Sequence, residues 1–293
     1  MTKKPTLTAH TETGSFFGSF YMVLASVCFA VMGILIKKAS LKFTLHEYEL
    51  VFWRVLFALV VLGVQAVILR RSFKTSHPRP HFWRSFIGTL SLFMFFYGIT
   101  HLPLATAVTF SNTSTIFLAI LSIIILKQKP SVITWIALII GFIGVVMILR
   151  PTLLNFGVVP TLIGLGSGVL AGYAYLQVRE LSLLGEPSWK IVFYFSLVST
   201  LMAGVASTLK GWTAMTEEML PYLLGIGVFA MAGQLLMTHA YKVGRKFMVS
   251  ALGYLGVVLA TLYGVWGFDE TLSLMTIIGI TLVIISGILA GKK

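Results

Sequence analysis

Five consecutive polar residues interrupt an otherwise apolar stretch of the sequence, and they are the first candidates for chemistry. The run extends from Ser111 to Thr115, near the middle of a segment long and apolar enough to cross a bilayer. Hydroxyls can bond to the preceding turn of their own helix, which is the alternative explanation for Thr113 and Ser114. The amide of Asn112 has more donors and acceptors than such a bond satisfies. We therefore predict that Asn112 lines a polar cavity, with Ser111 and Thr115 beside it on neighbouring helical rows.

A second set of polar side chains in the C-terminal half has the chemistry to bind an uncharged part of a ligand. Tyr173, Tyr175 and Tyr254 each combine an aromatic face with a hydroxyl, and Gln234 offers an amide. Positions two apart on a helix point about 200° apart, so we expect at most one of Tyr173 and Tyr175 to face the cavity. For Gln234, a hydrogen bond to a neighbouring helix remains the alternative.

The ionisable residues limit which side chains could couple the protein's activity to protons. All nine acidic residues lie near the ends or turns of apolar segments, and none lies at a segment centre. Arg54 lies inside such a segment, so a pair with Glu47 or Glu49 near its outer end is one coupling candidate. His239 is the other, because histidine titrates near neutral pH. For all of these residues, a purely structural role remains the alternative.

Motifs for other chemistries are missing from the sequence. The single cysteine, Cys28, excludes an internal disulfide and a cysteine-based metal site. No phosphate-binding G-K-[ST] and no metal-binding H-E-x-x-H motif is present, which disfavours an ATP-driven pump. We therefore expect no catalytic residues, no metal and no cofactor.

Composition determines the elements that must position these residues. The hydrophobic fraction is 57% and the charged fraction only 11%, outside the range of soluble domains. Irregular backbone cannot face lipid, so the fold class is an all-α integral membrane protein. Glycines four apart, as at Gly168 and Gly172, predict close helix contacts. The ten predicted transmembrane helices are 16–36, 47–69, 83–100, 104–126, 131–149, 158–177, 188–209, 219–240, 247–267 and 273–291.

The distribution of basic residues predicts the orientation. With the N-terminal tail (1–15) inside, the cytoplasmic connections hold 16 Lys and Arg, including Arg84 at the start of the third segment, against 5 outside. We therefore expect both termini in the cytoplasm and a location in a bacterial-type inner (plasma) membrane. The net charge of +13 is spread along one membrane face, so we expect no nucleic-acid partner.

An odd number of helices per repeat inverts the second copy, and ten helices divide into a first half at 16–150 and a second half at 151–293. Shifting the chain by 142 residues places Asn112 over Tyr254 in the same layout of segments. We therefore predict two inverted five-helix repeats, with both residues at a cavity near the midplane.

Motifs in the same segments resemble a known family. The sequence Y-G-I-T-H-L-P-L-A-T-A begins at Tyr97, and G-Q-L-L-M-T-H-A-Y begins at Gly233. They are followed by Tyr254 and by F-D-E-T-L-S from Phe268. These motifs resemble the EamA-type ten-helix members of the drug/metabolite transporter superfamily. Gln128 stands where the family's first copy has glutamate. The resemblance implies a secondary transporter with a central cavity, and Tyr97 completes the candidate substrate-binding residues.

The sequence as a whole favours a carrier for a small organic metabolite that works by alternating access. Interior polar groups without a carboxylate favour a zwitterionic, neutral or aromatic solute over a purely anionic one. The resemblance favours export of amino-acid-like metabolites. The alternatives are an uptake carrier or exchanger for a cofactor or nucleoside-type metabolite and a membrane-embedded lipid-processing enzyme. The expected partners are the substrate, the lipid bilayer and, if transport is proton-coupled, protons. Both a monomer and a homodimer remain open.

Overall fold

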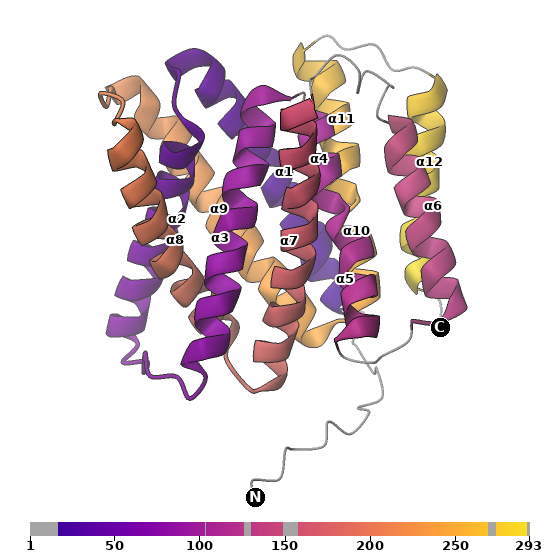
Figure 1. Cartoon of the computed structure of the whole chain (residues 1–293), viewed down its shortest axis with the longest axis horizontal. Coiled ribbons are helices and arrows are strands. Elements are labelled where there is room, and N and C mark those ends of the chain that lie inside the picture. The colour runs from indigo at the N-terminus through magenta and orange to yellow at the C-terminus, as the bar shows by residue number, and fades with distance from the viewer. Residues whose placement is uncertain (1–16, 103, 126–129, 149–157, 269–273, 292–293) are drawn as a thin grey trace, which may run out of the picture.

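Every regular element in the described part of the chain is a helix (Figure 1). The structure is a computed structural model that describes residues 17–102, 104–125, 130–148, 158–268 and 274–291. The helices are α1 (Phe17–Phe43), α2 (Glu47–Ile68), α3 (Pro78–His101), α4 (Leu104–Asn112), α5 (Ser114–Ile124), α6 (Val132–Ile148), α7 (Val158–Leu183), α8 (Ser188–Lys210), η2 (Glu217–Met219), α9 (Leu220–Val243), α10 (Lys246–Leu252), α11 (Leu255–Phe268) and α12 (Leu274–Gly291). The prediction of an all-helical chain is confirmed.

Long apolar helices show that this is a multi-pass membrane protein. Six helical segments of the described chain, at α1, α2, α3, α7, α8 and α9, are long and apolar enough to cross a membrane. Their outer faces carry apolar stripes at helical spacing. In α8, for example, Leu201, Val205 and Leu209 are 64%, 63% and 84% exposed. Such stripes over the whole bundle would promote aggregation in water, whereas a bilayer covers them.

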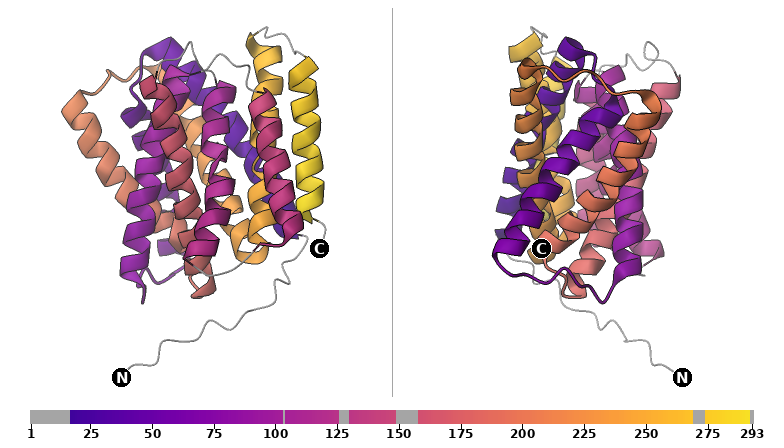
Figure 2. Two further views of the ribbon diagram at one scale, coloured as in Figure 1. Left: turned by 45° about the vertical axis from the view of Figure 1, so that its right-hand side comes forward. Right: turned by 90° about the vertical axis from the view of Figure 1, so that its left-hand side faces the viewer.

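Helices from the N-terminal half of the chain pack against helices from the C-terminal half throughout the bundle. The closest partners are α1 with α9, α3 with α7, α2 with α8 and α6 with α12. Figures 1 and 2 show α6 and α12 together at one end of the bundle. Between α1, α2, α3 and α9 lies a core of fully buried apolar side chains, including Ile36, Val51, Phe96 and Ile226.

Two segments that the sequence predicts as single helices are each broken near the middle. The predicted span 104–126 consists of α4 and α5, which meet at Thr113, and the predicted span 247–267 consists of α10 and α11, which meet at Gly253 and Tyr254. At the first break, the Thr113 N–H donates to the carbonyls of both Thr109 and Phe110, at 3.1 and 3.2 Å. Breaks of this kind within a membrane are tolerated where protein or a cavity surrounds them.

Helix α7 packs closely against the first break and shields its backbone from lipid. A Cβ atom on Gly168 of α7 would collide with Thr113 Oγ1 and with the carbonyl oxygen of Phe110. Four residues later, a Cβ atom on Gly172 would lie 2.9 Å from both Phe117 Cβ and the Ser114 carbonyl oxygen. The two glycines therefore allow α7 to pack directly against the backbone at the break.

Polar contacts join the α2–α3 connection to the α7–α8 connection at one end of the bundle, the lower end in Figure 1. Glu186 is 7% exposed and accepts a hydrogen bond from Thr75. Its carboxylate lies 3.5 Å from His77 Nδ1 and 3.6 Å from Lys190 Nζ. Burial raises the pKa of the Glu186 carboxyl, but the Thr75 bond and the Lys190 charge outweigh it, so the pKa is lowered on balance.

The lowered pKa of Glu186 predicts a pH-dependent contribution to stability. Because the folded carboxyl has the lower pKa, its contribution is present above the unfolded value of about 4.3 and is lost as the pH falls through the folded value. Glu186→Gln should reduce the unfolding free energy by about 1–3 kcal/mol at pH 7 and by less near pH 4. Thermal unfolding in detergent at both pH values checks this, with the exposed Glu217→Gln as the control. Equal loss at both pH values would contradict the assignment.

Candidate substrate cavity

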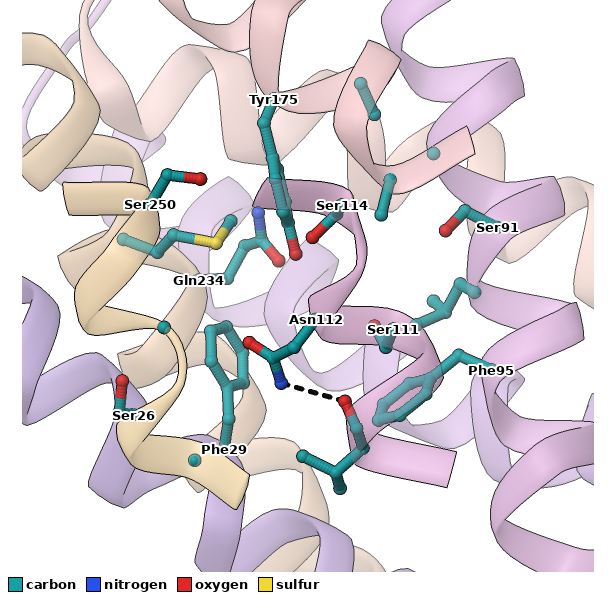
Figure 3. Close-up of a pocket in the computed structure, with 18 of the residues that line it drawn as sticks. Ser26, Phe29, Ser91, Phe95, Ser111, Asn112, Ser114, Tyr175, Gln234 and Ser250 are labelled. Carbon is teal, nitrogen blue, oxygen red and sulfur yellow. Dashed lines mark hydrogen bonds between the residues drawn. The ribbon is translucent and has the colours of Figure 1, made fainter. Parts of the chain in front are cut away.

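A cavity of about 130 Å³ lies inside the bundle, and both broken segments contribute to its wall. This volume has room for several water molecules. Its wall mixes aromatic and polar side chains (Figure 3). Its wall includes Phe29 of α1, Arg54 of α2, Arg84, Gly88, Ser91 and Phe95 of α3, Ser111 and Asn112 of α4, Ser114 and Thr115 of α5, Tyr175 of α7, Gln234 of α9, Gly253 at the second break and Gly256 of α11.

Asn112 occupies the place that the sequence predicts for it. It is the last residue of α4, and Figure 3 shows its side chain between Phe29, Gln234 and Ser111. Its Nδ2 donates to the carbonyl of Val108 at 2.8 Å, which leaves the side-chain oxygen for another partner. That oxygen lies 3.2 Å from the position of a Cβ atom on Gly253. Asn112 thus brings the first break next to the second.

Four of the other predicted binding residues also line the cavity: Ser111, Thr115, Gln234 and Tyr175. Of the two tyrosines on α7, only Tyr175 is in the lining, as the angular argument predicts for the pair. The amide nitrogen of Gln234 is buried and has no hydrogen-bond partner among the described residues. Thr115 donates to the carbonyl of Asn112 at 2.8 Å and also bonds to Tyr254. These groups present donors and acceptors for an uncharged portion of a ligand.

Three predicted binding residues do not line the cavity. Tyr254 is fully buried behind the wall, where its hydroxyl bonds to Thr115 and its ring packs against Gly141. The neighbouring Gly253 lines the cavity in its place, because the second break turns the backbone there. Tyr97 stacks on His101 at the end of α3, with ring centroids 3.9 Å apart. Tyr173 lies on a different face of α7 from Tyr175 and is also outside the lining.

The ionisable residues are arranged differently from the sequence-based hypothesis. Glu49 is buried, but its carboxylate accepts hydrogen bonds from the N–H and the hydroxyl of Thr213. Five residues turn a helix by about 140°, so Glu49 and Arg54 face different sides of α2. Neither Glu47 nor Glu49 forms a salt bridge with Arg54 within the described chain, and Arg54 instead lines the cavity. His239 lies outside the lining and packs edge-on against Tyr21 at 4.6 Å.

Arg84 is a site residue that the sequence reading missed. The distribution of basic residues places it with the cytoplasmic connections, because the third span is predicted to begin only at 83. The helix begins at Pro78, since proline is favoured in the first turn, and Arg84 is 2% exposed in the cavity wall. The spacing of Arg84, Gly88, Ser91 and Phe95 follows one helical face, and all four line the cavity. This spacing is the signal that would have identified Arg84.

Comparison with known proteins decides the family. The EamA-like transporter family matches the chain over residues 16–150 and 159–291. The chain belongs to this family. EamA-like proteins are transporters, so the family assignment argues against the lipid-processing enzyme considered from the sequence.

Individual relatives of this EamA-like protein cover nearly all of its length. The pseudopaline exporter of Pseudomonas aeruginosa is 31% identical, with 92% of this chain and 94% of the exporter covered. An S-adenosylmethionine uptake transporter of Rickettsia prowazekii is 23% identical, with 91% and 90% covered. A solved crystal structure superimposes with a TM-score of 0.74 at 16% identity, covering 94% of this chain and 96% of the other, which supports the fold alone.

Proposed function

We propose that this protein is a secondary transporter that carries a small organic metabolite across a bacterial inner membrane by alternating access. The observation that carries the proposal is the cavity between the two matched segments, lined by residues at both helix breaks. Discontinuous helices at a central site are typical of transporters built from two repeats. The relatives include an exporter and an uptake transporter, and we propose export because the exporter has the higher identity.

The packing of the helices supports a mechanism in which two five-helix halves move against each other. If α4 with α5 and α10 with α11 are counted as one span each, exchanging the halves maps the pair α1–α9 onto α3–α7. The same exchange maps α2–α9 onto α3–α8, and the pairs α2–α8 and α6–α12 onto themselves. Such exchange symmetry is expected of inverted repeats around a pseudo-two-fold axis. Moving Arg84 into the membrane lowers the cytoplasmic charge count from 16 to 15 against 5, so the proposed orientation stays, with both termini cytoplasmic.

A transport assay on Asn112 tests this proposal. Proteoliposomes containing the protein should take up specific compounds from a bacterial metabolite extract, as measured by mass spectrometry against empty liposomes. Asn112→Ala should lower the initial rate about two- to tenfold at low solute concentration, because one neutral hydrogen bond contributes about 0.5–1.5 kcal/mol. Thr100→Ala is the control, since the side chain of Thr100 lies outside the cavity lining and its hydrogen bonds in the described chain stay within α3. If the parent enriches no compound, transport is contradicted; if Asn112→Ala matches the parent, Asn112 is not in the binding site.

A further inference from the structure

Two arginines lie in the wall of the cavity. The side chains of Arg54 and Arg84 come from neighbouring helices, and the residues are 5% and 2% exposed. Guanidinium groups stay protonated in proteins, so the cavity holds two positive charges. No aspartate or glutamate is among the residues that line it, and neither arginine has a carboxylate within 4.0 Å in the part of the chain that the structure describes.

Some hydrogen-bond donors of these arginines have no partner in the part of the chain that the structure describes. Arg84 Nε and Nη1 are buried without a hydrogen-bond partner among the described residues. The guanidinium carbon of Arg84 lies 4.0 Å from the centre of the Phe195 ring, and that of Arg54 lies 5.6 Å from the centre of the Phe96 ring. An aromatic face attracts a cation, but it does not replace the oxygen acceptors that guanidinium N–H groups bond to. Arg54 forms no hydrogen bond and no salt bridge with the described residues, so both groups retain donors for a ligand.

Other partly buried cations in the same bundle are satisfied by backbone carbonyls. Lys37 Nζ donates to the carbonyls of Ile99 and Leu102 at 2.9 and 3.0 Å, where α3 ends. Arg54 and Arg84 therefore differ from a cation such as Lys37, which caps the C-terminal end of a helix. A buried charge without a partner is costly, and residues that keep such a charge inside a membrane usually face a ligand or an ion path.

The two arginines lie near the starts of two helices that run in opposite directions. Arg54 follows the start of α2 by seven residues and Arg84 follows the start of α3 by six, or about 10 and 9 Å along each axis. The two helices are consecutive, joined by a short connection and in contact, so they run antiparallel and their starts lie on opposite faces of the bundle. The backbones of the two arginines therefore lie at different depths in the bundle, while both residues line the same cavity.

We infer that the cavity binds an organic anion, whose carboxylate or phosphate oxygens accept hydrogen bonds from Arg84 and Arg54. Arginine matches both groups because its planar donors pair with two oxygens at once. Phe29, Phe95 and Tyr175 then pack against the apolar part of the same ligand. This inference rests on the proposed transport function and changes the expected substrate from a neutral or zwitterionic solute to an anionic one.

Thermal unfolding of the full-length protein in detergent tests the anion site directly. The probes are citrate for carboxylates, glycerol 3-phosphate for phosphates, and the neutral triethyl citrate, each compared with potassium chloride at equal ionic strength. At least one anion should raise the unfolding midpoint of the parent above the chloride value, whereas the neutral ester should not. Arg84→Gln and Arg54→Gln should each raise the anion concentration needed for half of this shift at least tenfold.

Controls separate the cavity arginines from the general charge of the protein. Arg79→Gln removes an exposed charge from the same helix as Arg84. The anion should raise the unfolding midpoint of this variant as much as that of the parent. Arg84→Lys, which keeps the charge but loses the planar donors, should fall between the parent and Arg84→Gln. Arg84→Gln without anion should unfold no earlier than the parent, which shows that it folds. Equal midpoints of the parent in every anion and in chloride would overturn the inference, and so would an undiminished shift in Arg84→Gln.

The transport assay distinguishes failure of this inference from failure of the proposed function. Compounds enriched by the parent should be anions at pH 7, and Arg84→Gln should lose their enrichment. Enrichment of neutral or cationic compounds that is equal in Arg84→Gln would overturn the anion site while leaving transport intact. An anion-dependent midpoint shift without any enrichment would support the anion site and contradict transport.

Discussion

Gly168→Ala should lower the unfolding free energy by about 3 kcal/mol, the upper end of the usual cost of overpacking. At an ordinary helical position the same change stabilises a protein by about 0.5–1 kcal/mol, because alanine has less freedom in the unfolded chain. At position 168 the added methyl group would collide with Thr113 Oγ1 and the Phe110 carbonyl oxygen. The carbonyl is backbone at a helix break, so it cannot rotate away, and α7 must move from α4 and α5.

Gly63→Ala is the matched control for this change. The methyl group at position 63 would meet only Phe193 Cε2, at an ordinary contact distance of 3.6 Å. It should therefore leave the midpoint of thermal unfolding in detergent unchanged or slightly raised. If Gly168→Ala is as stable as Gly63→Ala, the close packing of α7 against the first break is not a determinant of stability.

The sequence predicted the helices well because lipid imposes a simple requirement on them. Apolar length alone predicted α2 as 47–69 against Glu47–Ile68 and α8 as 188–209 against Ser188–Lys210. It did not predict the breaks at Thr113 and at Gly253. A break depends on what packs beside it. At Thr113 the neighbour is Gly168 of α7, and the hydropathy of residues 104–126 does not indicate which helix packs there.

The candidate site was predicted in part, for a similar reason. Asn112 and Gln234 were identified because an amide in hydrocarbon needs a polar neighbour, and both line the cavity. Tyr254 also has a polar neighbour, but that neighbour is Thr115, behind the cavity wall. Its polarity therefore could not show whether it lines the cavity or is buried behind it. Arg84 was missed because arginine near a helix start is usually solvated, although its spacing with Gly88, Ser91 and Phe95 indicates one helical face. The packing of α3 against α7 and α8 buries it.

Filling the cavity should reduce transport strongly without unfolding the protein, and Gly256→Phe is the change that tests this. Gly256 lines the cavity, and a Cβ atom there would meet only Val108 Cγ1, at 3.9 Å, so the first atom of a new side chain is not blocked. A phenyl ring would take up much of the cavity's volume of about 130 Å³. A solute cannot share that volume in a close-packed interior, so uptake into proteoliposomes should fall roughly tenfold or more.

The matched control is Gly63→Phe, which adds the same ring to a glycine of α2 outside the cavity lining. Its Cβ atom also has an ordinary contact, so its cost to folding should be similar. We expect Gly63→Phe to transport at a rate close to that of the parent and both variants to keep unfolding midpoints within a few degrees of it. The pair needs no knowledge of the substrate, because whichever compound the parent enriches serves as the readout. Normal transport by a folded Gly256→Phe would place the solute path elsewhere in the bundle, and the polar groups around Asn112 would then serve only to hold the two broken helices together.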